Sequence, residues 1–100
     1  MKISTTYDNG VFRAVLAESF TFSDHAIFRE LLREMESKKL SQITIDLAGV
    51  DFVDSAALGM LLLLREVSTK KRAVVTISGS QGQVRKMLEI SKFGQLFKLV

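Results

Sequence analysis

The segment from Asp46 to Gly59 contains the residues best suited to chemistry. It reads Asp-Leu-Ala-Gly-Val-Asp-Phe-Val-Asp-Ser-Ala-Ala-Leu-Gly and places the pair Asp54-Ser55 just before a long apolar run. The first backbone N–H groups of a helix are unpaired and carry partial positive charge. A phosphate on Ser55 would lie in a favourable field there, although the neighbouring Asp54 would repel it. Ser55 is therefore a candidate phosphorylation site.

The same residues have structural interpretations. A serine before a helix accepts a hydrogen bond from a backbone N–H two or three residues on, which stabilises the helix by about 1 kcal/mol. The residues alone leave Ser55 open between helix cap and modification site. Asp46, Asp51 and Asp54 are close in sequence and could bind a cation, but aspartates at strand ends more often cap turns.

Other catalytic chemistry has little support in the sequence. There is one histidine, His25, and no cysteine. A metal site or a catalytic triad needs partners that a lone histidine lacks. The glycines form neither a GxGxxG fingerprint nor a Walker loop. We predict that the protein is not an enzyme and holds no cofactor and no metal.

Size and composition indicate a single folded domain. The chain has 100 residues, of which 47% are apolar and 25% charged. This length supports one core but not two, so we predict one domain over residues 1–100. The formal net charge is +3. Lys38-Lys39 and Lys70-Lys71-Arg72 fall where helices are expected to end, where cations complement the helix dipole, so we predict no nucleic-acid binding.

No segment has the properties of a membrane span or a signal peptide. The longest apolar stretch without a charge, Ala56 to Leu64, is less than half of the about 20 residues that a span requires. The first residues contain neither an apolar signal core nor a cleavage site. We predict a cytoplasmic protein without direct membrane insertion.

Hydrophobic periodicity predicts alternating strands and helices. Asn9-Gly10 is a strong hairpin signal between two short strands. Apolar residues at helical spacing indicate the first helix, and the leucine-rich run after Ser55 indicates a second helix that is buried on most of its circumference. We predict strands at 2–7, 11–17, 43–47, 73–77 and 96–100, helices at 24–38, from 55 and at 81–92, and a turn at 48–54.

This order, ββαβαβαβ, predicts an α/β domain. Strands joined by crossover helices pair in parallel, and the initial hairpin adds an antiparallel strand. The expected architecture is therefore a mixed sheet packed with about three helices.

At the Asp54-Ser55 motif the sequence resembles STAS domains, and specifically the single-domain anti-sigma factor antagonists. The similarity covers nearly the whole chain. It is carried by the opening hairpin, the Phe-x-x-x-x-x-Phe-Arg start of the first helix, the strand from Ile43 to Leu47, the run from Phe52 to Gly59, and the final segment from Val84 to Phe97.

The resemblance implies partner switching. The unphosphorylated antagonist would bind an anti-sigma factor that is itself a GHKL-type serine kinase, and so release the sigma factor. Phosphorylation of the motif serine, Ser55 here, would abolish binding, and a PP2C-type phosphatase would restore it. The ATP site belongs to the kinase, so this chain would be a substrate and not a catalyst.

The predicted partner-binding surface is the turn before the second helix with the helix start, continued along the exposed side of that helix. Its residues are Asp51, Phe52, Val53, Asp54, Ser55, Ala56, Ala57, Leu58 and Gly59. Relatives often have Ser or Thr at the position of Ala56 and Gly at that of Ala57. With alanine at both, Ser55 is the only hydroxyl from Ala48 to Gly59.

The sequence leaves an alternative function and the oligomeric state open. A non-switching accessory subunit of an ABC transporter complex, with Ser55 as a helix cap, is the alternative function. The expected oligomeric state is a monomer or weak dimer, because leucines of the second helix that remain exposed would form a patch for a partner or a second copy.

Overall fold

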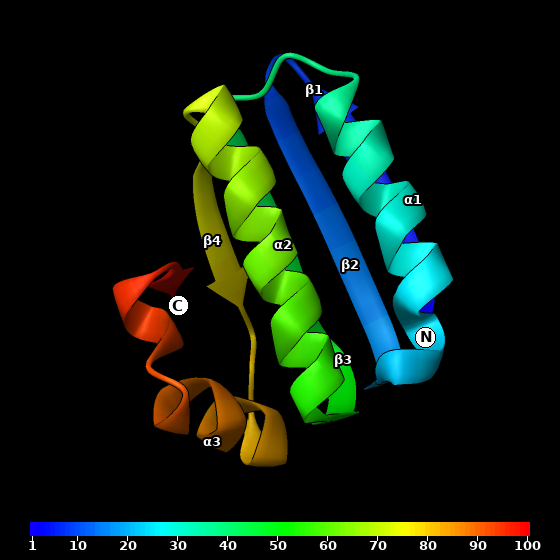
Figure 1. The fold of residues 1–100 in the computed structure, drawn as a ribbon, viewed down its shortest axis with the longest axis vertical. Helices are drawn as coiled ribbons and strands as arrows, with labels where there is room; N and C mark the ends of the chain where they lie inside the picture. The colour runs from blue at the N-terminus through cyan, green and yellow to red at the C-terminus, as the bar shows by residue number, and fades with distance from the viewer.

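The computed structural model describes all of residues 1–100 as one sheet with helices α1 and α2 on one face (Figure 1). The elements are β1 (Lys2–Asp8), β2 (Val11–Phe20), the 3-10 turn η1 (Phe22–Asp24), α1 (His25–Glu36), β3 (Gln42–Val53), α2 (Ser55–Lys71), β4 (Val74–Ser78), α3 (Gly82–Ile90), the 3-10 turn η2 (Phe93–Gln95) and β5 (Lys98–Leu99). This confirms the predicted α/β class and the order ββαβαβαβ.

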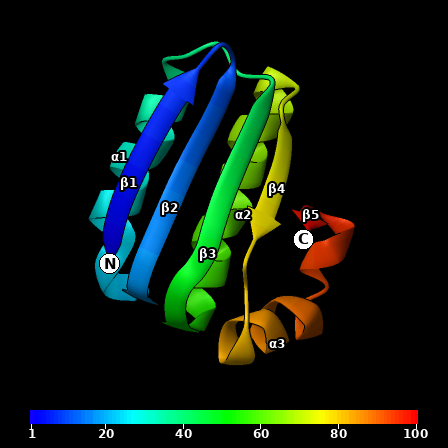
Figure 2. The same cartoon turned by 180° about the vertical axis from the view of Figure 1, so that it is seen from behind.

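The sheet has five strands in the spatial order β1-β2-β3-β4-β5. β1 and β2 are antiparallel, and every other neighbouring pair is parallel, as predicted. The crossover helices α1 and α2 both lie on the same face of the sheet. Figure 2 shows the opposite face, which these two helices leave uncovered.

The core lies between that sheet face and the two helices. Alternate residues of β2 and β3 point into it, as period-two strands require. The predicted stripe of α1 is fully confirmed, since all four of its residues are buried: Phe28, Leu31, Leu32 and Met35. Asn9 and Gly10 both have positive φ, 50° and 86°, which confirms the tight hairpin turn.

The predicted turn at 48–54 is wrong, because β3 continues to Val53. β2 also runs past its predicted end and stays paired with β3 as far as Phe20 opposite Val53, through two shifts of register. Gly49 serves this pairing, since a Cβ there would lie 3.2 Å from the carbonyl oxygen of Leu16. The glycine therefore permits a close approach of two strands and does not mark a turn.

The expectation that α2 is buried on most of its circumference is also wrong. Leu58, Leu61 and Leu64 are buried, whereas Leu62 is 43% exposed and Leu63 is 36% exposed. The helix packs one side against the sheet, and no element covers the other side (Figure 1). No helix of the structure is both long and apolar enough to cross a bilayer.

Candidate functional site at the start of α2

The far end of β3 is held in place by α3. β4 pairs with β3 only as far as Asp46 opposite Ser78, so the rest of β3 has no strand on that side. There the Gln83 side chain accepts a hydrogen bond from the Val53 N–H (3.0 Å) and donates one to the Val53 carbonyl (2.8 Å). Gln81 donates to the Ala48 carbonyl at 3.1 Å. These amides replace a missing strand and fix the backbone that leads into the site.

Asp54 caps α2. Its Oδ1 accepts a hydrogen bond from the Ala57 N–H at 2.8 Å, which satisfies one of the unpaired donors of the first helical turn. Its Oδ2 accepts from the Phe22 N–H at 3.1 Å. The structural interpretation of Ser55 as the helix cap is therefore wrong, because the preceding aspartate does this work.

Ser55 is the first residue of α2, and its side chain is exposed. Its hydroxyl forms no hydrogen bond within the chain, unlike the serines at 23, 37, 41 and 68, although the other five serines also form none. What distinguishes Ser55 is its place at the first residue of a long helix. Ser55 therefore presents a hydroxyl group that the fold does not use, at the positive end of a long helix.

The predicted partner-binding residues divide by burial. Asp51, Phe52, Ser55 and Gly59 are exposed, and Asp54 and Ala56 are half-buried. The remaining three, Val53, Ala57 and Leu58, lie in the core. The nine residues thus form a continuous segment, of which the exposed and half-buried members reach the surface and the three core residues do not.

The aspartates considered for a cation do not converge. The Asp46 carboxylate pairs with Arg13 at 2.7 Å through Oδ2 and accepts from the Ala48 N–H through Oδ1. The Asp54 carboxylate is used by the cap. The structure contains no group of three or more acidic, histidine or cysteine side chains that could hold a metal ion.

Phe22 is a feature of the site that sequence reasoning missed. Its side chain is 70% exposed, and its ring stacks on that of His25 with centroids 6.1 Å apart. Because its N–H bonds to Asp54, this aromatic residue lies next to the start of α2. Phe52, which is 46% exposed, is a second exposed aromatic residue close to Ser55 in sequence. The sequence feature that could have indicated it is the Phe-x-x-x-x-x-Phe-Arg motif at the start of the first helix, because Phe22 is the first residue of that motif.

Asp24 fixes the turn η1 that carries Phe22. Its carboxylate is buried and accepts hydrogen bonds from the Thr21 N–H at 2.8 Å and from the Met1 ammonium at 3.0 Å. Burial alone would raise the pKa of Asp24, but the Thr21 hydrogen bond and the charge of the Met1 ammonium outweigh it and hold the pKa below its usual value.

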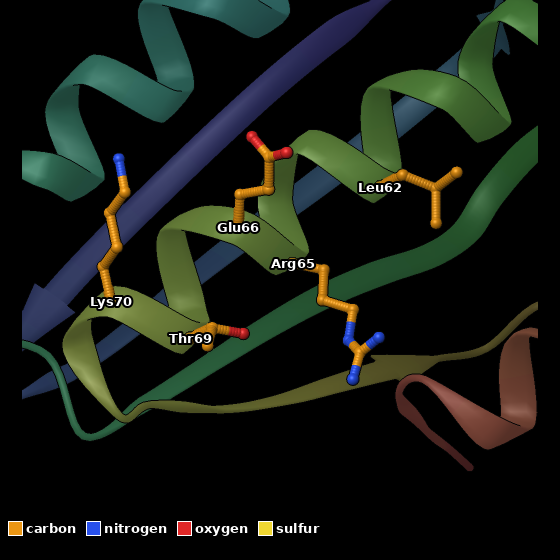
Figure 3. A pocket seen from close by; sticks show the side chains of 5 residues that line it. All are labelled: Leu62, Arg65, Glu66, Thr69 and Lys70. Carbon is orange, nitrogen blue, oxygen red and sulfur yellow. The ribbon is translucent and has the colours of Figure 1, made fainter.

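A shallow hollow on the exposed side of α2 is separate from this site. It is lined by Leu62, Arg65, Glu66, Thr69 and Lys70. Figure 3 shows Glu66 and Lys70 pointing towards α1, and Arg65 pointing away from it. The side chains do not converge on one point, so the hollow has no arrangement suited to catalysis.

The comparisons with known proteins agree with this architecture. The STAS domain family model matches residues 2–100. A STAS-domain containing protein of Pseudomonas aeruginosa (strain UCBPP-PA14) is 38% identical over 80 residues, which are 80% of this chain and 78% of that protein.

Solved structures of anti-sigma factor antagonists have a similar fold. One from Mycobacterium paratuberculosis gives a TM-score of 0.86 at 15% identity, over 98% of this chain and 83% of that chain. The antagonist SpoIIAA in its unphosphorylated form gives 0.75 at 10% identity, over 99% of this chain and 87% of that chain. The phosphorylated form of Bacillus SpoIIAA gives 0.73 at 12% identity, over 99% and 91%.

The match over residues 2–100, together with the mixed sheet and the Asp54-Ser55 motif at the start of α2, assigns the family. This chain belongs to the STAS domain family.

Proposed function

We propose that this chain is an anti-sigma factor antagonist that acts by partner switching at Ser55. Its unphosphorylated form binds an anti-sigma factor that is also a GHKL-type serine kinase. Phosphorylation of Ser55 by that kinase abolishes the complex, and a PP2C-type phosphatase restores it. The chain is then a substrate and ligand of the kinase, not an enzyme, and it acts in the cytoplasm.

The observation that supports this proposal most is that Asp54 caps α2, which leaves the hydroxyl of Ser55 free. Asp54 accepts the hydrogen bond of the Ala57 N–H at the start of α2, so modification of the exposed Ser55 hydroxyl would not remove the helix cap. A kinase can therefore modify Ser55 while α2 stays folded.

The surroundings of Ser55 explain how a phosphate would change binding. A phosphoserine adds a charge of about −1.5 to −2. Here it would stand next to Asp54, whose carboxylate also holds the Phe22 N–H, so that the exposed ring of Phe22 lies beside the start of α2. Asp51 and Phe52, both exposed, precede it in the last residues of β3. A partner that covers these aromatic rings would have to desolvate the new charge, which opposes binding.

Binding measurements with a purified anti-sigma partner test the proposal. We expect Ser55→Ala to bind as unphosphorylated wild type does, and Ser55→Asp to bind about 5- to 150-fold more weakly, the usual range of a coupled switch. Ser91→Asp is the matched control, because Ser91 is an exposed serine at the C-terminal end of α3 and lies outside the predicted partner-binding segment. Equal affinities of Ser55→Ala and Ser55→Asp would contradict switching and favour a non-switching binding module.

A further inference from the structure

β1 is an outer strand with a free edge (Figure 2). It pairs with β2 without a register shift, and its sequence contains no proline. The only charges in it are at its ends, Lys2 and Asp8, so its middle lacks the charges and bulges that normally protect an edge strand. The opposite edge, β5, has only two residues. β1 is therefore the edge at which another strand could pair.

The hairpin geometry determines which backbone groups of β1 face outward. Asp8 and Val11 flank the tight turn at Asn9-Gly10, and the N–H and C=O groups of alternate residues from Asp8 back to Lys2 bond to β2. The N–H and C=O groups of Ile3, Thr5 and Tyr7 consequently point away from β2. These residues form the outward donors and acceptors of the edge.

We propose that two copies of this chain pair antiparallel through β1, about a two-fold axis at Thr5. In this register each outward-facing residue meets an outward-facing residue of the second copy: Thr5 meets Thr5, and Ile3 meets Tyr7. Lys2 stands opposite Asp8 of the second copy, and Asp8 opposite its Lys2. The strand is thus complementary to itself in charge, in apolar character and in hydrogen bonding, as a two-fold interface requires.

The monomer leaves the two end charges of β1 unpaired. Lys2 and Asp8 are exposed and take part in no ion pair within the chain. On the helix side of the edge, Ile3 lines a groove between β1 and α1 together with Ile27 and Leu31, and the charged side chains of Glu30, Arg33 and Glu34 also line it. Ile27 is 47% exposed and Tyr7 41% exposed. Within its own chain the Tyr7 hydroxyl donates to the Lys39 carbonyl at 2.6 Å, and the Lys38 ammonium lies over the ring. The exposed part of the second copy's Tyr7 ring would stand opposite Ile3.

The dimer leaves both candidate sites accessible. The Lys2 end of β1 lies at the same end of the molecule as the start of α2, since Met1 bonds to Asp24, and Phe22 of the same turn bonds to Asp54. An antiparallel pairing therefore places the two Ser55 residues at opposite ends of one continuous sheet. The pairing does not depend on the proposed partner switch.

Exchange of the end charges tests the pairing by sedimentation equilibrium. In the Lys2→Asp variant, the aspartate at position 2 of each copy stands opposite Asp8 of the other copy. In the Asp8→Lys variant, the lysine at position 8 of each copy stands opposite Lys2 of the other copy. We expect each single variant to raise the dimer dissociation constant by about tenfold relative to wild type. The double variant, Lys2→Asp with Asp8→Lys, has the composition of the wild type and restores both pairs, so it should dimerise as wild type does.

A mixture of the two single variants sharpens the test. An aspartate-ended strand opposite a lysine-ended strand has two complementary pairs, so the mixture should form a heterodimer more tightly than either variant self-associates. A wild type that stays monomeric up to millimolar concentration would overturn the proposal. So would single variants that dimerise as well as wild type, or a double variant that fails to recover.

A proline substitution tests the outward direction of the Thr5 N–H. Thr5→Pro should fold with an almost unchanged Tm but lose dimerisation, because proline is tolerated where a strand N–H faces solvent. Thr6→Pro is the matched control, since its N–H bonds to β2 and its loss should lower the Tm. If Thr5→Pro stays folded and dimerises as well as wild type, the assigned edge is wrong.

Discussion

The starts of α1 and α2 each have an aspartate at the capping position, and the two aspartates do different work. Asp24 precedes His25, is buried, and forms no side-chain hydrogen bond to α1. It bonds instead to Thr21 and to Met1. Asp54 precedes Ser55, is half-buried, and caps α2 through the Ala57 N–H.

The difference in burial matches a difference in role: the buried Asp24 holds the fold together, whereas the half-buried Asp54 lies beside a candidate regulatory serine. Asp24 holds the chain terminus and the η1 turn together inside the protein, and the following His25 stacks on Phe22. Asp54 stabilises its helix from the surface and leaves the next side chain unbound. Substitutions at the two helix starts should therefore separate stability from binding.

The largest loss of stability is expected for Asp24→Ala. The change leaves the Thr21 N–H and the Met1 ammonium without their carboxylate partner in a buried place, which should cost about 3 kcal/mol of unfolding free energy. Urea denaturation measures this, with Asp51→Ala as the control, because Asp51 is exposed and forms no hydrogen bond. A loss as small as that of the control would show that the buried aspartate contributes no more than a surface one.

Asp54→Ala should cost about 1–2 kcal/mol, because the cap of α2 is lost and the Phe22 N–H loses its acceptor. The same denaturation experiment measures the change. The amide of Phe22 should also exchange faster with deuterium than in wild type. Unchanged stability would mean that the first turn of α2 does not need its cap.

The acid dependence of stability should report on Asp24. Its pKa is lower in the folded protein than the ordinary value of 3.8, so the stability it contributes is complete above that value. This contribution is lost as the pH falls through the lowered pKa. Asp24→Asn should therefore flatten the stability profile in this acidic range, and an unchanged profile would contradict the shift. Protonation of Asp24 should lower the free energy of unfolding less than Asp24→Ala does, because the protonated carboxyl group still occupies the same buried position.

Ser55→Ala should have the smallest effect on stability, within about 0.5 kcal/mol, because the hydroxyl forms no bond in the fold. Thermal and urea unfolding of the variant measure this. A loss of about 1 kcal/mol would identify Ser55 as a cap after all. The hydroxyl of Ser55 would then contribute to the stability of α2, as the Asp54 carboxylate does.

The sequence predicted the features that depend on local pattern. The hairpin at Asn9-Gly10, the stripe of α1 from Phe28 to Met35 and the start of α2 at Ser55 are all present. Each depends on neighbouring residues, whose spacing is visible in the sequence.

The features that the sequence missed depend on distant contacts. The Asp54 carboxylate, which caps α2, also accepts a hydrogen bond from the Phe22 N–H, 32 residues away along the chain. The extension of β3 depends on β2 and on Gln83 of α3. The exposure of Leu62 follows from the absence of an element over that side of α2. Local propensity carries no information on these contacts.

Intact-mass and phosphosite analysis of the protein isolated from its native cells tests most directly whether Ser55 is a phosphorylation switch. We expect a phosphorylated fraction that maps to Ser55 and changes with growth or stress conditions. A protein without phosphate under all such conditions, or with phosphate only on other residues, would contradict this expectation.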